Sequence, residues 1–284
     1  MSKVAIVTDS TSYIPTNLLN QYNIKVAPLE LIWGEKTYKD GVDIQPHEFY
    51  ERLKTAKVMP TSSQATPATM LSIFQSMVEQ EMDVVGIFIS SELSGTLQSA
   101  IQAKDMLEKG KDKVFLVDSL ATSIALGFIT LAAARAAEAG ASAKECQAVA
   151  EKARDHTGIY FAVDTLEFLH RGGRIGGAQR FIGSALNLKP ILALKDGKVE
   201  GVERIRTKGK AHDRMLELVS EQVKGKKNIR LAVLHANAAD DAHALLDRAA
   251  RQLNPVEKIF TEVSPVIGTH AGPGTVGLAY MVEM

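Results

Sequence analysis

Residues 84–100 read Val-Val-Gly-Ile-Phe-Ile-Ser-Ser-Glu-Leu-Ser-Gly-Thr-Leu-Gln-Ser-Ala, an apolar run that leads through a hydroxyl-rich turn into a helical pattern. The run 84–89 predicts a buried strand, and Gly95 allows close approach of a ligand to the backbone. The first amides of a helix lack intrahelical acceptors and carry the positive end of its dipole. The turn therefore favours a carboxylate or phosphate site. An ordinary helix cap by Ser94 or Thr96 is the simpler alternative.

Two more hydroxyl-rich turns make a ligand site more plausible than a single cap would. Residues 9–12 (Asp-Ser-Thr-Ser) follow a predicted strand at 3–8, and residues 60–67 (Pro-Thr-Ser-Ser-Gln-Ala-Thr-Pro) precede a predicted helix. Residues 25–33 form a further apolar run. The first half thus alternates strands and helices, which is typical of a mostly parallel α/β sheet. In such sheets ligands bind beyond the carboxyl ends of the strands.

The second half has a different pattern, typical of an α+β unit. A Lys-Asp-Gly-Lys segment at 195–198 predicts a hairpin turn, and the glycine-rich segment 265–275 is expected to be a loop between two strands. The helices expected here cover 165–171, 178–186, 208–223 and 238–252. The predicted architecture is a two-domain α/β protein, with an N-terminal domain at 1–158 and a C-terminal domain at 159–284.

Composition excludes several classes of protein. The chain has 284 residues, 45% of them hydrophobic, and a formal net charge of zero, so nothing favours bulk attraction to nucleic acid or acidic lipid. The longest apolar stretch, 124–134, is too short to span a bilayer. Cys146 is the single cysteine, so no intrachain disulfide can form, and a cytoplasmic location without stable membrane insertion is expected.

Several motifs of independent enzymes are missing from the sequence. It contains no phosphate loop, and its glycines at 172–177 do not have the spacing of a dinucleotide-binding turn. Ser94 is not part of a Gly-x-Ser-x-Gly elbow, and His47 has no second histidine at the spacing of a zinc helix. We therefore expect no metal and no cofactor.

Three basic side chains remain as candidates for binding an anion. His270 lies in the predicted loop at 265–275, where an imidazole can donate a hydrogen bond to an anion. Arg174 lies in the double-glycine segment, and Arg206 follows the second strand of the hairpin; a guanidinium suits a carboxylate or a phosphate. The simpler alternatives are a loop histidine bonded to a nearby carbonyl and arginines that are solvated surface charges.

An ordered set of motifs resembles the DegV family over essentially the whole chain. The motifs are VTDST (7–11), PTS (60–62), ISSELSGT (89–96), DTLEFLHRGGRI (164–175), KPIL (189–192) and VIGTHAGPG (266–274). The resemblance implies two α/β domains that hold a long-chain fatty acid between them, with the acyl chain in an apolar tunnel. One departure is Gly176-Gly177, where the family often has a single Ser or Gly.

The resemblance also implies roles for individual residues. It assigns the fatty acid carboxylate to a polar set, which is Thr61, Ser62, Ser94, Gly95, Thr96 and His270. In bacteria with a fatty acid kinase, the family member presents the bound acid to that separate kinase, which makes the acyl phosphate. Arg174 and Arg206 match basic positions associated with the surface that faces the kinase.

The preferred interpretation is a carrier of fatty acid that is not an enzyme by itself. The alternative from another class is an enzyme acting on a small phosphorylated or carboxylated metabolite, with Ser94 as the nucleophile and His270 as the base. A structural or regulatory module without a ligand is a third alternative.

Overall fold

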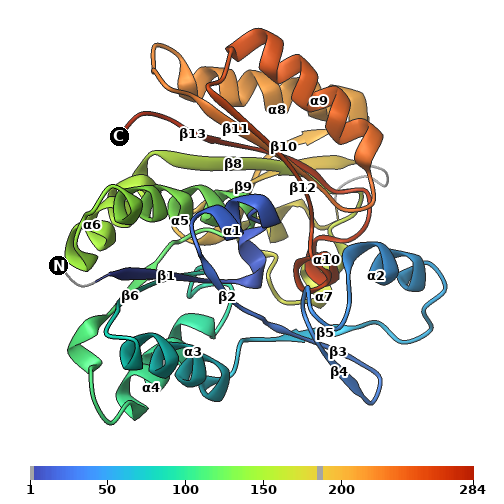
Figure 1. Cartoon of the computed structure of the whole chain (residues 1–284). Helices are drawn as coiled ribbons and strands as arrows, with labels where there is room; N and C mark the ends of the chain where they lie inside the picture. Colours follow the sequence, from blue (N-terminus) through green and yellow to red (C-terminus); the bar gives the residue numbers. More distant parts are fainter. Residues whose placement is uncertain (1–2, 184–187) are drawn as a thin grey trace.

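The computed structural model describes residues 3–183 and 188–284, and over these residues the strands form three sheets (Figure 1). The first is a four-stranded parallel sheet in the order β2-β1-β6-β7. Its strands are β1 (Val4–Asp9), β2 (Lys25–Ala27), β6 (Asp83–Phe88) and β7 (Val114–Asp118). The helices that flank these strands are α1 (Thr16–Gln21), α3 (Pro67–Glu79) and α4 (Thr96–Met106). The parallel sheet predicted for the first half is confirmed.

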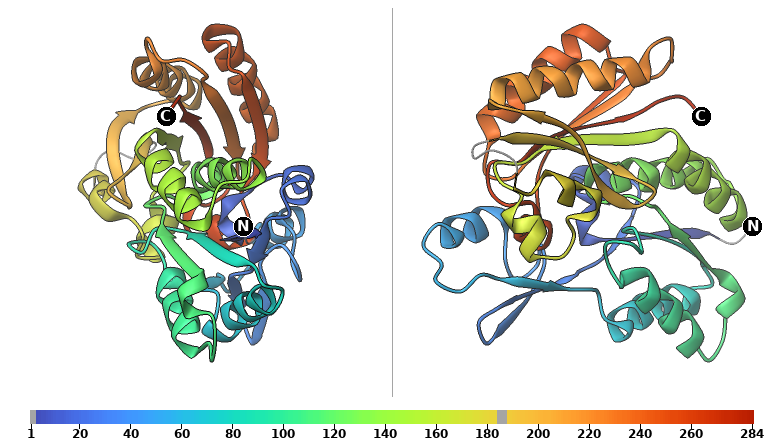
Figure 2. Two further views of the ribbon diagram at one scale, coloured as in Figure 1. Left: turned by 60° about the vertical axis from the view of Figure 1, so that its left-hand side comes forward. Right: turned by 180° about the vertical axis from the view of Figure 1, so that it is seen from behind.

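The second sheet has six strands in the order β10-β9-β8-β13-β11-β12. They are β8 (Thr157–Ala162), β9 (Lys189–Lys195), β10 (Lys198–Ile205), β11 (Arg230–His235), β12 (Glu257–Glu262) and β13 (Val276–Met281). β11 and β12 pair in parallel, and the other neighbours are antiparallel. Helices α8 (Lys208–Val223) and α9 (Ala239–Leu253) cover its outer face, as Figure 2 shows.

A small antiparallel sheet and a short helix extend from one side of this body. The sheet has the order β4-β3-β5, with β3 (Glu30–Trp33), β4 (Lys36–Lys39) and β5 (Thr61–Ser63), and the helix is α2 (Pro46–Leu53). The apolar run 25–33 therefore supplies strands to two different sheets. The break falls at Pro28, which has no amide hydrogen for a strand ladder.

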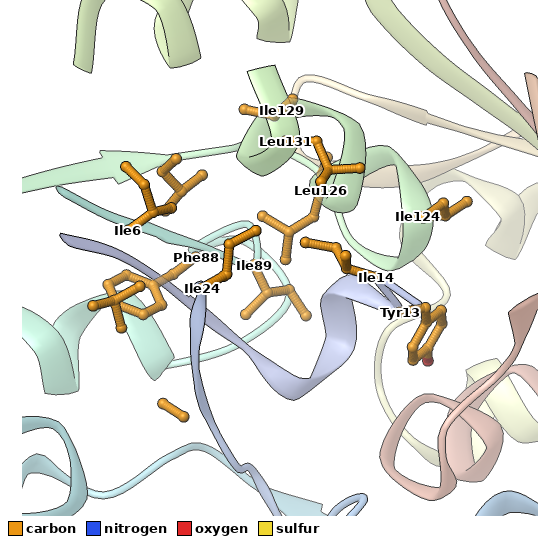
Figure 3. Close-up of a cluster of buried hydrophobic side chains, with 14 of the residues drawn as sticks. Ile6, Tyr13, Ile14, Ile24, Phe88, Ile89, Ile124, Leu126, Ile129 and Leu131 are labelled. Carbon is orange, nitrogen blue, oxygen red and sulfur yellow. The ribbon is translucent and has the colours of Figure 1, made fainter. Parts of the chain in front are cut away.

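Helix α5 (Ser123–Glu138) lies between the two large sheets, beside α6 (Ala143–Asp155) (Figure 1). Its residues from Ser123 to Ala134 are all buried, because one side packs on the parallel sheet and the other on the six-stranded sheet. Figure 3 shows side chains of α5, including Leu126, meeting those of β1 and β6. The core is therefore continuous across both halves, and a boundary between 158 and 159 would fall inside β8; the division into two domains stays a prediction.

Two segments of the second half differ from expectation. Residues 265–275 are not all loop, because Pro265–Ala271 forms helix α10, with Pro265 in its first turn. A short helix α7 (Glu167–Arg171) precedes the glycine segment. The helix expected at 178–186 is a 3-10 turn at Gly176–Phe181, and the part of that prediction at 184–186 lies outside the described residues.

Candidate functional site

The turn after β6 is held in place by buried hydroxyl groups. Ser90 donates from its amide to the Ala121 carbonyl (2.8 Å) and from its hydroxyl to the Gly197 carbonyl (2.9 Å), so the hairpin of the six-stranded sheet is fixed to this turn. Ser94 Oγ is hydrogen-bonded to Thr96 Oγ1 (2.9 Å) and accepts from the Thr96 amide (3.3 Å). The Ser94 hydroxyl therefore accepts from the first amide of α4, although the N-cap residue of that helix is Gly95 and the helix has no side-chain cap.

Ser94 also faces a cavity that residues of both halves of the chain line, with an empty volume of about 960 Å³ that includes space open to solvent. Its polar lining includes Ser62, Ser94, Arg174 and His270, all of which are at least partly exposed. Its buried apolar lining includes Leu29, Ile159, Leu169, Leu234 and Val263. The cavity thus has a polar mouth and a mostly apolar interior, an arrangement that suits an amphipathic ligand.

His270 is the most constrained polar side chain at this mouth. Its Nε2 lies 2.6 Å from Ser62 Oγ, and its Nδ1 is buried with no hydrogen-bond partner among the described residues. Burial, followed by the positive charge of Arg174, lowers the pKa of His270 to about 4. The ring is therefore neutral at neutral pH and carries one N–H. A ligand anion at the mouth would meet the Ser62 hydroxyl and the imidazole beside it, whose Nδ1 is packed against Gly172.

Two glycines allow His270 to occupy this place. A Cβ atom on Gly172 would overlap His270 Nδ1, although the φ of Gly172 is ordinary. On the same helix as His270, a Cβ on Gly268 would lie 2.5 Å from the hydroxyl oxygen of Tyr50. That hydroxyl donates to the Val263 carbonyl (3.1 Å) just before α10. α10 is therefore packed too closely on α2 and α7 for any larger residue at these positions.

Asp40 anchors the beginning of α10 from a distant part of the chain. Its buried carboxylate accepts from the Ser10 hydroxyl (2.7 Å) and from the Val266 amide (3.4 Å). Burial raises the pKa of Asp40 to about 6. Sequence reasoning missed this residue, because Val266 is 226 positions away and no local motif signals the contact.

The turn after β1 has a structural role as well. The buried carboxylate of Asp9 accepts from the amide and hydroxyl of Thr11 and from the Ile89 amide (2.7 Å). Burial raises the pKa of Asp9. This first hydroxyl turn therefore joins β1 to the end of β6 and, through Ser10 and Asp40, to α10.

His270 and Asp40 are expected to affect stability in opposite directions between about pH 4 and pH 6.5. The folded pKa of His270 is below its ordinary 6.5, so its contribution is complete above pH 6.5 and is lost as pH falls toward 4. The folded pKa of Asp40 is above its ordinary 3.8, so its contribution is complete below pH 3.8 and is lost as pH rises through about 6.

Asp40→Asn should therefore make the free energy of unfolding rise more steeply with pH than in the parent, and His270→Asn should make it rise less steeply. Each difference from the parent should be on the order of 2–3 kcal/mol over this window. Urea unfolding of lipid-free protein at several pH values measures it. The other buried titratable groups are common to all three proteins, so the differences isolate this pair. Parallel profiles for parent and variants would contradict the assignment.

Only some of the residues predicted from the sequence to bind the carboxylate line the cavity. Ser62, Ser94 and His270 line it. Thr61 is exposed and does not belong to the described lining of the cavity. Thr96 is buried behind Ser94, and Gly95 lies against the side chain of Gln64.

The two arginines also differ from each other. Arg174 is exposed but lines the cavity, and its guanidinium donates to the carbonyls of Leu93 (3.1 Å) and Gly172 (2.7 Å). The resemblance associates both arginines with a surface that faces a partner, and this stays a prediction; Arg174 in addition borders the cavity. Arg206 is exposed after the end of β10 and lies outside the described lining.

The catalytic pair of the enzyme alternative is not formed. The His270 ring is hydrogen-bonded to Ser62, whereas the Ser94 hydroxyl is hydrogen-bonded to Thr96. Over residues 3–183 and 188–284, no three His, Cys, Asp or Glu side chains are grouped as metal ligands. Among the described helices, none is both long and apolar enough to cross a bilayer.

The fold and site define a layered α/β protein with an apolar cavity that opens at a polar mouth. The chain belongs to the DegV family, whose model, described as "Uncharacterised protein, DegV family", matches residues 3–283. A DegV domain-containing protein of Halalkalibacterium halodurans is 34% identical over 284 residues, which is 100% of each chain.

Two solved structures are similar over nearly the whole length. A DegV family protein from Thermus thermophilus, described by its fatty acid binding, has a TM-score of 0.92 and 36% identity and covers 99% of this chain and 100% of its own. DegV from Bacillus subtilis, described as a fatty acid binding protein, has a TM-score of 0.91 and 33% identity and covers 100% of both chains.

Proposed function

We propose that this protein is a cytoplasmic carrier that binds a long-chain fatty acid between its two halves. The observation that carries the proposal is the cavity itself, whose buried interior is apolar and whose mouth presents Ser62, Ser94 and His270. The solved relatives from Thermus thermophilus and Bacillus subtilis, described as binding fatty acid, support it. The carboxylate would lie among the three polar side chains and the acyl chain in the interior.

Burial of the acyl chain accounts for most of the expected affinity. A saturated chain of about sixteen carbons, at ~0.8 kcal/mol per CH₂, offers on the order of ten kcal/mol before the cost of ordering the ligand. The polar mouth then sets orientation, because a buried carboxylate without partners is unfavourable. The acyl chain therefore provides most of the binding free energy, and the carboxylate fixes the orientation of the ligand.

Mass spectrometry of denatured, freshly purified protein tests this proposal. We expect a long-chain fatty acid to be released in roughly stoichiometric amount. Lipid-free protein that cannot be loaded with palmitate would overturn the proposal. Turnover of a small ester or phosphate by such a protein would support the enzyme alternative instead.

Replacing Ser94 by Ala is expected to weaken fatty acid binding about ten-fold, because it removes a hydrogen bond to a charged group worth ~1.5–3 kcal/mol. The matched control is Ser91→Ala in the same turn, where the exposed hydroxyl donates to Asp118 (2.5 Å) and, among the described residues, the side chain is not part of the cavity wall. Calorimetric titration with palmitate measures both. Unchanged affinity in Ser94→Ala would show that the head group lies elsewhere.

We further propose that the protein presents the bound acid to a separate fatty acid kinase and forms no acyl phosphate alone. Arg174 and Arg206 are both exposed in the C-terminal half, and Arg174 is at the cavity mouth. Exposed positive charges there would attract a partner that carries nucleotide phosphates and would act mainly on the rate of encounter.

Arg206→Ala is expected to retain the lipid but to reduce acyl phosphate formation by a cognate kinase about ten-fold at low salt, with a smaller loss at high salt. Arg251→Ala, an exposed arginine of α9, is the control. Each variant is loaded with labelled fatty acid and assayed with kinase, ATP and Mg²⁺ at two salt concentrations. If Arg206→Ala equals the parent at both, the docking role is wrong; loss of the lipid would place Arg206 in the cavity.

A further inference from the structure

The first turn of α5 brings a second set of polar groups into the interior of the cavity. Thr122 and Ser123 both line it, and Ser123 is only 3% exposed. Neither Thr122 Oγ1 nor Ser123 Oγ has a hydrogen-bond partner within the described part of the chain. The N-cap residue Thr122 makes no side-chain capping bond to α5. The start of the helix therefore places buried, unpaired hydroxyls, together with its positive dipole end, in the wall of the cavity.

Other buried hydroxyls near this place are satisfied by the protein. Ser119 Oγ donates to the Ala121 carbonyl (3.1 Å), Ser90 Oγ to the Gly197 carbonyl (2.9 Å) and Thr275 Oγ1 to the Ala271 carbonyl (2.9 Å). The lack of partners at Thr122 and Ser123 thus sets them apart from these three hydroxyls. Buried polar groups in folded proteins are nearly always hydrogen-bonded, so the unpaired pair indicates a position where a bound molecule supplies the partner.

A saturated acyl chain would not supply it. Ile159, Leu194 and Leu234 line the same cavity, and a methylene chain across Ser123 would bury its hydroxyl without a hydrogen bond, which is unfavourable. A second carboxylate is also a poor match, because the one charged side chain of the described lining is Arg174 at the mouth. A neutral oxygen that both donates and accepts suits two hydroxyls and a helix start best.

We propose that the start of α5, with Thr122 and Ser123, is an interior subsite for a hydroxyl group carried on the acyl chain itself. The inference rests on the proposed function and extends it from plain fatty acids to hydroxylated long-chain acids. The carboxylate occupies the mouth, with Ser62, Ser94 and His270, and the chain hydroxyl meets Thr122 and Ser123 in the interior.

A panel of hydroxystearic acids that differ in the position of the hydroxyl tests the subsite, with stearic acid as the reference. Lipid-free parent, Ser123→Ala and Thr122→Val are titrated with each acid, and their melting temperatures are compared without ligand. The parent should bind at least one positional isomer as tightly as stearate or more tightly. In Ser123→Ala that isomer should lose about ten-fold in affinity, while stearate binds unchanged or more tightly. Thr122→Val keeps the side-chain shape and should likewise lower the affinity for that isomer.

The outcomes separate this inference from the proposed function. If stearate fails to bind to the parent, the proposed function is wrong and the subsite fails with it. If stearate binds but every hydroxystearate binds at least about ten-fold more weakly, as expected for burial of an unpaired hydroxyl, the subsite is wrong and the carrier role stands. The subsite would also be wrong if the ratio of hydroxystearate affinity to stearate affinity were the same in the parent and both variants. The hydroxyls of Thr122 and Ser123 would then form hydrogen bonds to water and none to the ligand.

Discussion

Replacing Gly172 by Ala is expected to weaken fatty acid binding by about 30- to 100-fold. The added Cβ would overlap His270 Nδ1 and would lie 3.1 Å from the Phe168 carbonyl oxygen. The imidazole must therefore shift from its place beside Ser62, so the polar mouth loses His270 and Ser62 loses its hydrogen-bond partner. Titration of lipid-free protein with palmitate measures the effect.

The adjacent Gly173→Ala is the matched control. Gly173 has a φ of +70°, and a Cβ atom added to it would have no neighbouring atom within 4 Å. Alanine there should therefore lower the free energy of unfolding by about 1–2 kcal/mol through backbone strain, without contacting His270. Gly173→Ala should lower the melting temperature but keep the affinity. Equal affinities for both variants and the parent would show that His270 is not part of the head-group site.

Replacing Leu194 by Trp is expected to weaken palmitate binding on the order of 100-fold and octanoate binding far less. Leu194 lies on β9 and lines the cavity, so an indole there occupies space that the acyl chain needs. Exclusion of about four methylenes, at ~0.8 kcal/mol each, removes ~3 kcal/mol of the binding free energy. A series of saturated acids of increasing length, titrated into each protein, measures the effect.

Lys195→Trp adds the same side chain one position further along β9. Lys195 is exposed, since neighbouring residues of a strand face opposite sides. It should bind the whole series like the parent, whereas Leu194→Trp should show a loss that grows with chain length. A uniform loss for all lengths in Leu194→Trp would indicate general destabilisation, and no loss would place the acyl chain elsewhere.

Elements with strong local signals were predictable from the sequence. The strand, hydroxyl turn and helix of residues 84–100 are present as β6, the turn and α4. The hairpin at 195–198 is present as well, with Asp196 and Gly197 both at positive φ. In each case the deciding interactions lie within a few residues: an apolar period, a capping position, or a backbone angle that Asn, Asp and Gly adopt readily.

The errors arose where local signals are weak. Glycines made 265–275 look like a loop, but Gly268 lies inside α10, where its missing side chain lets the helix pack on Tyr50 and Phe49. The glycine is needed there for a close tertiary contact, and its backbone angle is helical. Gly172 is similar, because its φ is ordinary and the neighbour that requires it is His270.

The sequence by itself determined the α/β class, the order of most elements and the family, while the binding of a carboxylate by Ser62, Ser94 and His270 stays a prediction. The class, the order of elements and the family follow from patterns and motifs that are continuous along the chain. The tertiary structure alone decided that His270 pairs with Ser62, 208 positions away, and that Asp40 anchors α10. It also decided that Thr122 and Ser123 face the cavity without partners among the described residues. Such contacts depend on how distant elements are brought together in the folded core, and residue type at one position does not specify which partner the fold supplies.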